Sequence, residues 1–339
     1  MENSGNKKVL VVGAGGFAGG FIVEEGLKRG YEMWAGIRET TSRKYLTDPR
    51  IKFAVFDFDN PESLAETMRE SMPAEEKWDW IVYNLGATKA ISFSDFSKVN
   101  YEYLKHFLEA LKSSEKIPER LLYMSSLSVL GPGHETDGGK FTEKDIPRPN
   151  TRYGASKLKA EMLLNMEGVP YIIFRPTGIY GPRDKDYFLM LKSMSKGFDF
   201  SAGYKKQLLT FIYVEDLARA VFDALEKAPA NQTYIISDDK EYSQKEFRKL
   251  ASASLGKKGI LGVPMPLWAV KAVSAIAEKI GVARMKPSTL NRDKYNIMKQ
   301  RNWSADISKA KKDFGFNPKV SLPEGIDKAV EWYRKENWL

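Results

Sequence analysis

The chain has 339 residues, of which 42% are hydrophobic and 29% are charged, and its formal net charge is +9. This length and composition predict a globular protein with one large domain or two modest ones. The chain contains no cysteine, which excludes disulfides, thiolate nucleophiles and cysteine metal sites. With His106 and His134 as its two histidines, we predict no metal site.

The distribution of charge and the sequence of the N-terminus indicate which partners and which location to expect. Basic residues are spread along the chain and mixed with acids, so we expect a small anionic cofactor or substrate and no nucleic acid. Residues 1–8 are polar and lack the apolar core of a secretory signal. Because no run of about 18 uncharged apolar residues occurs, we expect a cytoplasmic protein without an integral membrane span.

The first part of the chain alternates predicted strands with predicted helices. Short apolar runs predict strands at residues 8–12, 31–37, 51–56, 80–85 and 120–124. Helices are expected between them, at residues 21–29, 61–71 and 99–112. This alternation predicts an α/β fold of Rossmann type, a doubly wound parallel sheet whose ligands bind at the carboxyl ends of the strands.

The second part continues this pattern less regularly. We expect helices at residues 151–166, 214–227, 244–255, 264–280 and 322–338 and strands at 171–174, 208–212 and 233–236. We therefore predict a nucleotide-binding core from residues 1–180 and 205–238. Residues 181–204 and 239–339 are expected to form a smaller, mainly helical C-terminal substrate lobe.

A glycine-rich loop follows the first predicted strand. Gly13, Gly15, Gly16 and Gly19, with Phe17 among them, lead into the first helix. Glycines at this point allow a tight turn and a close approach of the backbone to a pyrophosphate at a helix N-terminus. The loop therefore predicts a dinucleotide cofactor.

The end of the second strand bears on which dinucleotide is bound. An acidic residue there favours NAD, whereas an arginine nearby accommodates the extra phosphate of NADP. Arg38 occupies this position, and Arg43 and Lys44 add positive charge soon after. We therefore expect NADP in preference to NAD. The alternative is that Arg38 is a solvated surface charge and that Glu39 holds the ribose.

Tyr153 and Lys157 are the candidates for acid–base chemistry. Residues four apart share one face of a helix, and an ammonium beside a phenol lowers the pKa of the phenol. The same spacing occurs at Tyr101 with Lys105 and at Tyr295 with Lys299. The pair at 153 and 157 alone follows a predicted strand that ends in a serine, Ser126. We therefore predict Ser126, Tyr153 and Lys157 as the catalytic residues.

These features resemble the extended short-chain dehydrogenases/reductases, the NAD-dependent epimerase/dehydratase family, over nearly the whole chain. The resemblance implies that Tyr153 gives or takes a proton at a substrate oxygen, which Ser126 holds. It implies that Lys157 lowers the pKa of Tyr153 and hydrogen-bonds the nicotinamide ribose. Hydride would then move between the nicotinamide and the carbon that bears the oxygen.

The same resemblance assigns further residues to the cofactor. It places Asp57 and Phe58 near the adenine and Leu85, Gly86 and Ala87 along the cofactor. The remaining implied contacts are Asn100, Pro176 and Thr177. The helical faces at residues 99–112 and 151–166 would allow two copies to pair as a homodimer.

The substrate remains open between two branches of the family. Nucleotide-sugar members commonly carry an asparagine where this chain has Gly178, and the stretch 299–306 lacks their Arg-x-Gly-Asp-like phosphate contact. Both features lean towards the dihydroflavonol-reductase and hydroxysteroid-dehydrogenase-like branch, which acts on apolar ketones and alcohols.

Three functional hypotheses follow. The first is an NAD(P)-dependent oxidoreductase acting on a ketone or secondary alcohol. The alternatives are a nucleotide-sugar epimerase or dehydratase and a non-catalytic NADP-binding sensor. The apolar segment at residues 263–280 lines a pocket, lies near a membrane surface or forms the core of the small lobe, and packing in the core is favoured.

Overall fold

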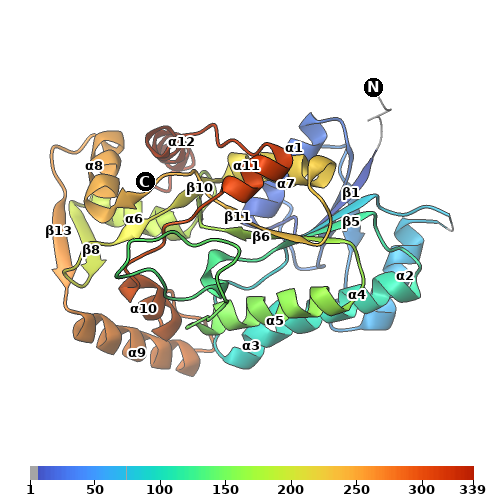
Figure 1. Ribbon diagram of the computed structural model, residues 1–339, viewed down its shortest axis with the longest axis horizontal. Coiled ribbons are helices and arrows are strands. Elements are labelled where there is room, and N and C mark those ends of the chain that lie inside the picture. The colour runs from blue at the N-terminus through green and yellow to red at the C-terminus, as the bar shows by residue number, and fades with distance from the viewer. Residues whose placement is uncertain (1–6, 74) are drawn as a thin grey trace.

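The computed structural model describes residues 7–73 and 75–339 and contains a central parallel sheet of seven strands (Figure 1). The strand order is β11-β6-β5-β4-β1-β2-β3. The strands are β1 (Lys8–Val12), β2 (Glu32–Ile37), β3 (Lys52–Val55), β4 (Trp80–Tyr83), β5 (Arg120–Met124), β6 (Tyr171–Pro176) and β11 (Gln232–Ile236). The order reverses between β1 and β4, where doubly wound sheets bind their ligands, and this confirms the predicted Rossmann-type fold.

Helices cover both faces of the sheet (Figure 1). One face carries α1 (Phe17–Lys28), α7 (Val214–Lys227) and α11 (Ser308–Phe314). The other face carries α2 (Pro61–Ser71), α4 (Tyr103–Ser113) and α5 (Arg152–Met166). Asn60 caps α2, because its side chain accepts hydrogen bonds from the backbone N–H groups of Glu62 and Ser63.

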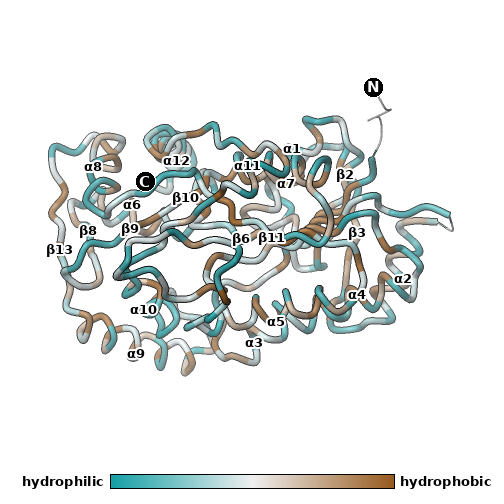
Figure 2. The backbone as a smooth tube through the Cα atoms, viewed as in Figure 1, coloured by the Kyte–Doolittle hydropathy of each residue, from teal (hydrophilic) through white to brown (hydrophobic). Residues whose placement is uncertain are grey.

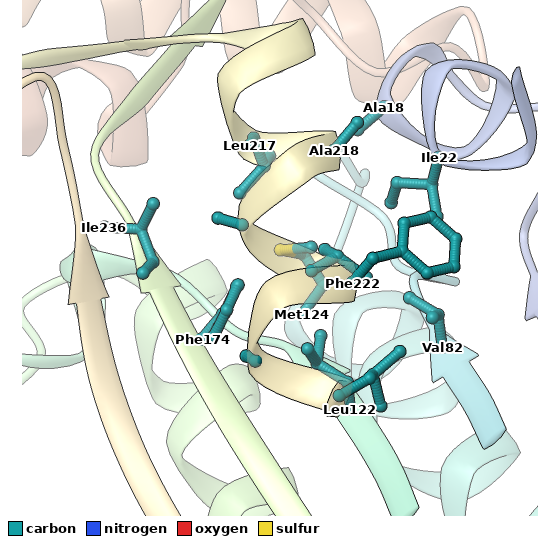
Figure 3. Packing of buried hydrophobic residues seen from close by; sticks show 14 of the residues in the cluster. Ala18, Ile22, Val82, Leu122, Met124, Phe174, Leu217, Ala218, Phe222 and Ile236 are labelled. Atoms are coloured by element: carbon teal, nitrogen blue, oxygen red, sulfur yellow. The ribbon is translucent and has the colours of Figure 1, made fainter. Parts of the chain in front are cut away.

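The strands are apolar on both sides because each side meets a helix layer. In β1, Val9 and Val11 belong to the cluster under α1 and α7, whereas Leu10 and Val12 belong to the opposite cluster. Successive side chains of a strand point to opposite faces, so a continuous apolar run is needed for burial on both faces. Figure 3 shows Phe222 of α7 packed over the side chains of Val82 and Leu122.

Short strand pairs and further helices lie outside the central sheet. The pairs are β7 (Gly178–Tyr180) with β10 (Phe211–Tyr213), β8 (Phe198–Ala202) with β13 (Leu261–Met265), and β9 (Leu208–Leu209) with β12 (Tyr242–Ser243). The helices are α6 (Asp186–Ser195), α8 (Gln244–Leu255), α9 (Leu267–Ala283), α10 (Arg292–Lys299) and α12 (Leu322–Lys335). Over the described residues, no helix has the length and apolar character needed to cross a membrane.

Residues 305–316 and the segment before α4 differ from the sequence-based expectation. Residues 305–316, predicted to belong to the lobe, pack with the sheet, where the Phe314 ring stacks on Phe174 at 6.1 Å between centroids. The helix expected at 99–112 is preceded by a further helix, α3 (Phe93–Ser97), and its first turn, Lys98–Glu102, is π-helical. A π turn is often found at a functional site, because its wider turn moves a side chain out of the regular helical register.

Candidate active site

The glycine loop is packed so tightly that side chains would not fit. Gly13 has φ of +84°, and a Cβ at this position would lie 2.8 Å from the backbone nitrogen of Leu85. A Cβ at Gly19 would collide with the carbonyl oxygen of Gly13. These glycines therefore bring the start of α1 against the ends of β1 and β4.

The N-terminus of α1 is suited to an anionic ligand. Gly16 is the N-cap residue and offers no side-chain oxygen, and the first turn carries no acidic side chain. The backbone N–H groups of the first turn are thus left for a ligand, and the helix dipole favours negative charge there. The loop is therefore a candidate site for the pyrophosphate of a dinucleotide, and the cofactor contacts expected of Gly13, Gly15, Gly16, Phe17 and Gly19 stay predictions.

Of the three cations expected near the cofactor, one has no hydrogen-bond or ion-pair partner among the residues that the structure describes. Lys44 forms an ion pair with Glu336 at 3.2 Å, and the Arg43 guanidinium lies 4.4 Å from the centroid of the Phe53 ring. The Arg38 side chain is exposed and makes neither a hydrogen bond nor an ion pair within residues 7–73 and 75–339. Arg38 is therefore the cation best placed to receive an additional phosphate.

The other residues predicted to contact the cofactor at strand ends differ in how accessible their side chains are to a ligand. Asp57 is exposed after β3, but the Phe58 ring is buried in the core and stacks on Tyr103 at 5.5 Å. Pro176 and Thr177 lie at the end of β6, and the Thr177 hydroxyl donates to the carbonyl of Ile236 at 3.4 Å. The Phe58 ring is therefore unavailable to a ligand, and the Thr177 hydroxyl proton is already engaged.

Asn100 ties the loop after β4 to the helix that carries Tyr153. Its amide accepts from the Ala87 N–H at 2.8 Å and donates to the Ala87 carbonyl at 3.1 Å. It also donates to the hydroxyl of Ser156 at 2.8 Å. Asn100 lies in the π-helical turn and is fully buried, so it holds residues 85–87 in a fixed position beside α5.

Lys157 is buried between the ends of β4 and β5. Its ammonium donates to the Met124 carbonyl at 2.8 Å and lies 4.8 Å from the centroid of the Tyr123 ring. A Cβ on Gly86 would lie 2.8 Å from Nζ, so the amine also faces the loop after β4. Burial lowers the pKa of Lys157 to about 7, and the carboxylate of Glu161 opposes this shift.

Tyr153 and Ser126 meet as the strand order predicted. Burial raises the pKa of Tyr153 to about 12, and the neighbouring Ser126 side chain opposes this shift. Ser126 Oγ also accepts from the Ser128 N–H at 3.2 Å and from the Ser128 hydroxyl at 2.9 Å. With both acceptor positions used, the Ser126 proton is available for donation. The expected lowering of the pKa of Tyr153 by Lys157 stays a prediction, because burial dominates here.

The two rival tyrosine–lysine pairs have different surroundings. Lys105 forms an ion pair with Glu109 at 3.6 Å, and the Tyr101 ring is covered by Lys159 at 3.8 Å. The Lys299 ammonium lies 5.3 Å from the centroid of the Tyr295 ring. Neither pair adjoins the end of a strand of the central sheet, so neither has a serine partner comparable to Ser126.

A buried ion pair behind Lys157 was missed by the sequence analysis. Glu161, one turn after Lys157, binds Arg175 of β6 through two contacts of 3.1 and 2.6 Å. The hydroxyl of Ser125 donates to the same carboxylate, and all three residues are buried. The available signal was the spacing of four residues between Lys157 and Glu161, which places both on one face of α5.

The lowered pKa of Lys157 predicts a pH-dependent contribution to stability. Between pH 7 and the ordinary value of 10.5, the unfolded chain binds a proton that the native lysine has released, so stability rises with pH. Below pH 7 both states are protonated, and the cost of burying the charge is constant and largest. The stability gain of Lys157→Met over wild type should fall by on the order of 3 kcal/mol from about pH 6 to about pH 10. Urea unfolding of both proteins measures this difference in stability. A difference that does not change with pH would contradict a lowered pKa for Lys157.

Comparison with known proteins agrees with this geometry. The family model described as "NAD dependent epimerase/dehydratase family" matches residues 9–237. The chain is 24% identical to dTDP-glucose 4,6-dehydratase of Neisseria gonorrhoeae (98% of this chain, 97% of that protein) and 22% identical to ceramide reductase of Caulobacter vibrioides (100% and 98%). Among solved structures, dTDP-glucose 4,6-dehydratase of Bacillus anthracis in complex with NAD superposes with a TM-score of 0.76 at 22% identity, covering 98% of each chain. The chain carries the glycine loop before α1, the hydrogen bonds of Asn100 and the group of Ser126, Tyr153 and Lys157. It belongs to the NAD-dependent epimerase/dehydratase family.

Proposed function

We propose that this protein is an NADP-dependent oxidoreductase that interconverts a ketone and a secondary alcohol on an apolar substrate. The observation that supports an apolar substrate is the close approach of Tyr187 to Gly178, the first residue of β7. A Cβ at this position would collide with the hydroxyl of Tyr187. The asparagine that nucleotide-sugar members carry at this point would therefore require the Tyr187 side chain to move.

The surroundings of Tyr187 are aromatic. Its ring centroid lies 5.6 Å from that of Phe211 and 6.3 Å from that of Tyr180. Phe211 and Tyr180 are buried and Tyr187 is half-buried, so the Tyr187 ring is the member of this cluster that an apolar ligand could contact. The similarity to a ceramide reductase over the full chain supports the same substrate class.

The residues of the site can supply acid catalysis for carbonyl reduction. A bound nicotinamide cofactor would provide or accept the hydride. Tyr153 is protonated at neutral pH and can donate its proton to the carbonyl oxygen, while Ser126 donates a second hydrogen bond to that oxygen. Lys157 links α5 to the end of β5, and Asn100 links the loop after β4 to α5.

A nucleotide-sugar dehydratase or epimerase is the second candidate, favoured by the similarity to dTDP-glucose 4,6-dehydratase. The two candidates separate in a substrate panel of a long-chain aliphatic ketone, dTDP-glucose and UDP-glucose, each with NADPH and NADH. We expect turnover of the ketone alone. Conversion of a sugar nucleotide without turnover of any ketone would replace the first proposal by the second. A sensor without catalysis is the least supported reading, since the chain has Ser126, Tyr153 and Lys157 and the first two are neighbours in the structure.

Arg38 provides the test of cofactor preference. Replacing it with alanine should weaken NADPH binding by about 10- to 100-fold and leave NADH binding unchanged, because a charge-assisted contact to the extra phosphate is lost. Fluorescence titration with both cofactors measures the two dissociation constants. The matched control is Arg43→Ala, since that guanidinium already stacks on Phe53. Equal losses for both cofactors in Arg38→Ala would remove the preference for NADP.

A further inference from the structure

Helix α9 exposes an apolar surface that nothing in the described chain covers. It buries Val270, Ser274 and Gly281, whereas Trp268 is 76% exposed and Ile276 is 59% exposed. A helix in a globular lobe normally turns such residues inward. Figure 2 shows hydrophobic residues along α9, at the outer edge of the lobe. Apolar groups gathered on a surface in this way mark a contact with another body.

Neighbouring segments extend this surface. Tyr204 is 72% exposed, and the adjacent Gly203 lies beside Leu267 at the start of α9. Met285, just beyond the end of the helix, is 83% exposed. We define the α9 surface by its exposed apolar side chains, Tyr204, Leu267, Trp268, Val273, Ile276, Ile280, Val282 and Met285. The strands that lead to it expose Phe198, Phe200 and Leu261 as well.

The ionisable residues of this region are strongly biased towards positive charge. Residues 257–286 contain six lysines or arginines and one acidic residue, Glu278. Lys271 and Lys279 are exposed among the apolar residues of α9. Glu278 points into the protein instead, where it forms ion pairs with Arg152 at 3.0 Å and with Arg292 at 3.7 Å. The outer side of α9 therefore presents apolar groups and cations without an acid.

We propose that the α9 surface binds the surface of an anionic lipid bilayer, with α9 lying in the interfacial plane. Apolar side chains would enter the boundary of the acyl chains, while Lys271 and Lys279 would meet lipid phosphates. Trp268 and Tyr204 have the amphipathic rings that favour this depth. A second copy of the chain fits less well, because a two-fold contact centred on α9 would bring the same lysines of both copies together.

The same ion pairs connect this surface to the active site. Arg152, the partner of Glu278, precedes Tyr153 in α5. In α10, which packs on α9, Asp293 accepts a hydrogen bond from the Tyr153 backbone N–H at 3.1 Å. A bilayer at α9 would thus lie close to the mouth of the site, where an apolar substrate could enter from the lipid. This consequence rests on the proposed function, whereas lipid binding itself does not.

Vesicle flotation of the full chain tests the proposal. Wild-type protein should float with phosphatidylcholine vesicles that contain phosphatidylglycerol, and binding should be lost at about 0.5 M salt or with phosphatidylcholine alone. The double variant Trp268→Glu/Ile276→Glu should bind at least about tenfold more weakly. Lys271→Glu/Lys279→Glu should bind more weakly to a similar degree. All four positions are exposed, so circular dichroism and cofactor affinity should remain those of wild type.

Met166→Glu is the matched control, since Met166 is 83% exposed at the far end of α5. This variant should float like wild type. The proposal is overturned if wild type does not float, or if Trp268→Glu/Ile276→Glu floats as well as wild type. It is also overturned if sedimentation velocity shows a wild-type dimer that Trp268→Glu/Ile276→Glu converts to monomer without any vesicle binding, because the occupant is then a second copy. None of these outcomes depends on which substrate the enzyme turns over.

Discussion

Replacing Tyr153 with phenylalanine is expected to lower kcat by about 10³-fold, because the variant loses the hydroxyl that donates a proton to the substrate oxygen. Binding of NADPH and the free energy of unfolding should stay close to wild type, since the buried ring is retained and only its hydroxyl is removed. Steady-state kinetics, cofactor titration and urea unfolding measure the three quantities separately.

The chain supplies matched controls for this substitution. Tyr101→Phe and Tyr295→Phe remove a hydroxyl from the other two tyrosine–lysine pairs, whose lysines face Glu109 or an aromatic ring. Both controls should retain kcat within about threefold of wild type. Wild-type turnover by Tyr153→Phe, or a large loss in Tyr295→Phe, would show that the acid lies elsewhere.

Replacing Arg175 with methionine is expected to destabilise the protein by about 3–5 kcal/mol. The loss arises because the Glu161 carboxylate stays buried without its two contacts to the guanidinium, leaving Ser125 as its remaining hydrogen-bond donor. Urea unfolding at neutral pH measures the change. Lys328→Met is the matched control, since the ion pair of Lys328 with Glu324 is exposed and should contribute less than about 1 kcal/mol.

A double variant separates the buried charge from the loss of packing. Glu161→Leu/Arg175→Met removes both charges and should recover at least half of the stability that Arg175→Met loses, because buried pairs can be replaced by apolar residues at little cost. If the double variant is less stable than Arg175→Met, the hydrogen-bond network around Ser125 stabilises the protein by more than the free-energy cost of burying its charges.

The central sheet could be predicted because its local signals agree with its tertiary setting. The run Lys8–Val12 is apolar on both sides, and the structure buries both sides of β1. The caps Asn60 and Ser243 act as their sequence patterns indicated, and each accepts a hydrogen bond from the first turn of its helix. The candidate catalytic residues could be selected from strand order, because Ser126 follows β5 and Tyr153 lies at the start of α5.

Other features depend on contacts that no local pattern encodes. The π-helical turn around Asn100 is defined by where its side chain finds partners, on Ala87 and Ser156. The strand pair β8–β13 joins segments about 60 residues apart through a parallel register that starts with Phe198 opposite Leu261. The bond from Glu161 to Arg175 likewise crosses from a helix to a strand.

The three basic residues expected near the cofactor could not be told apart from the sequence. Arg38, Arg43 and Lys44 are all basic and lie close together in the sequence. In the structure, Arg43 packs over the ring of Phe53 and Lys44 forms an ion pair with Glu336. Apolar patterning also could not tell an exposed helix from a buried one. The segment at 263–280 was expected to pack in the lobe, and most of the apolar side chains of α9 face outward instead.

The stoichiometry of cofactor consumption tests the proposed net reduction most directly. A reductase consumes one nicotinamide cofactor for each molecule of alcohol formed, whereas an epimerase or dehydratase returns the hydride to its own substrate and consumes none. With a long-chain ketone and NADPH, we expect equal amounts of NADPH lost and alcohol formed, and no reaction in Tyr153→Phe. Conversion of a sugar nucleotide with no net change in NADPH or NADH, together with no reaction of the ketone, would contradict the account.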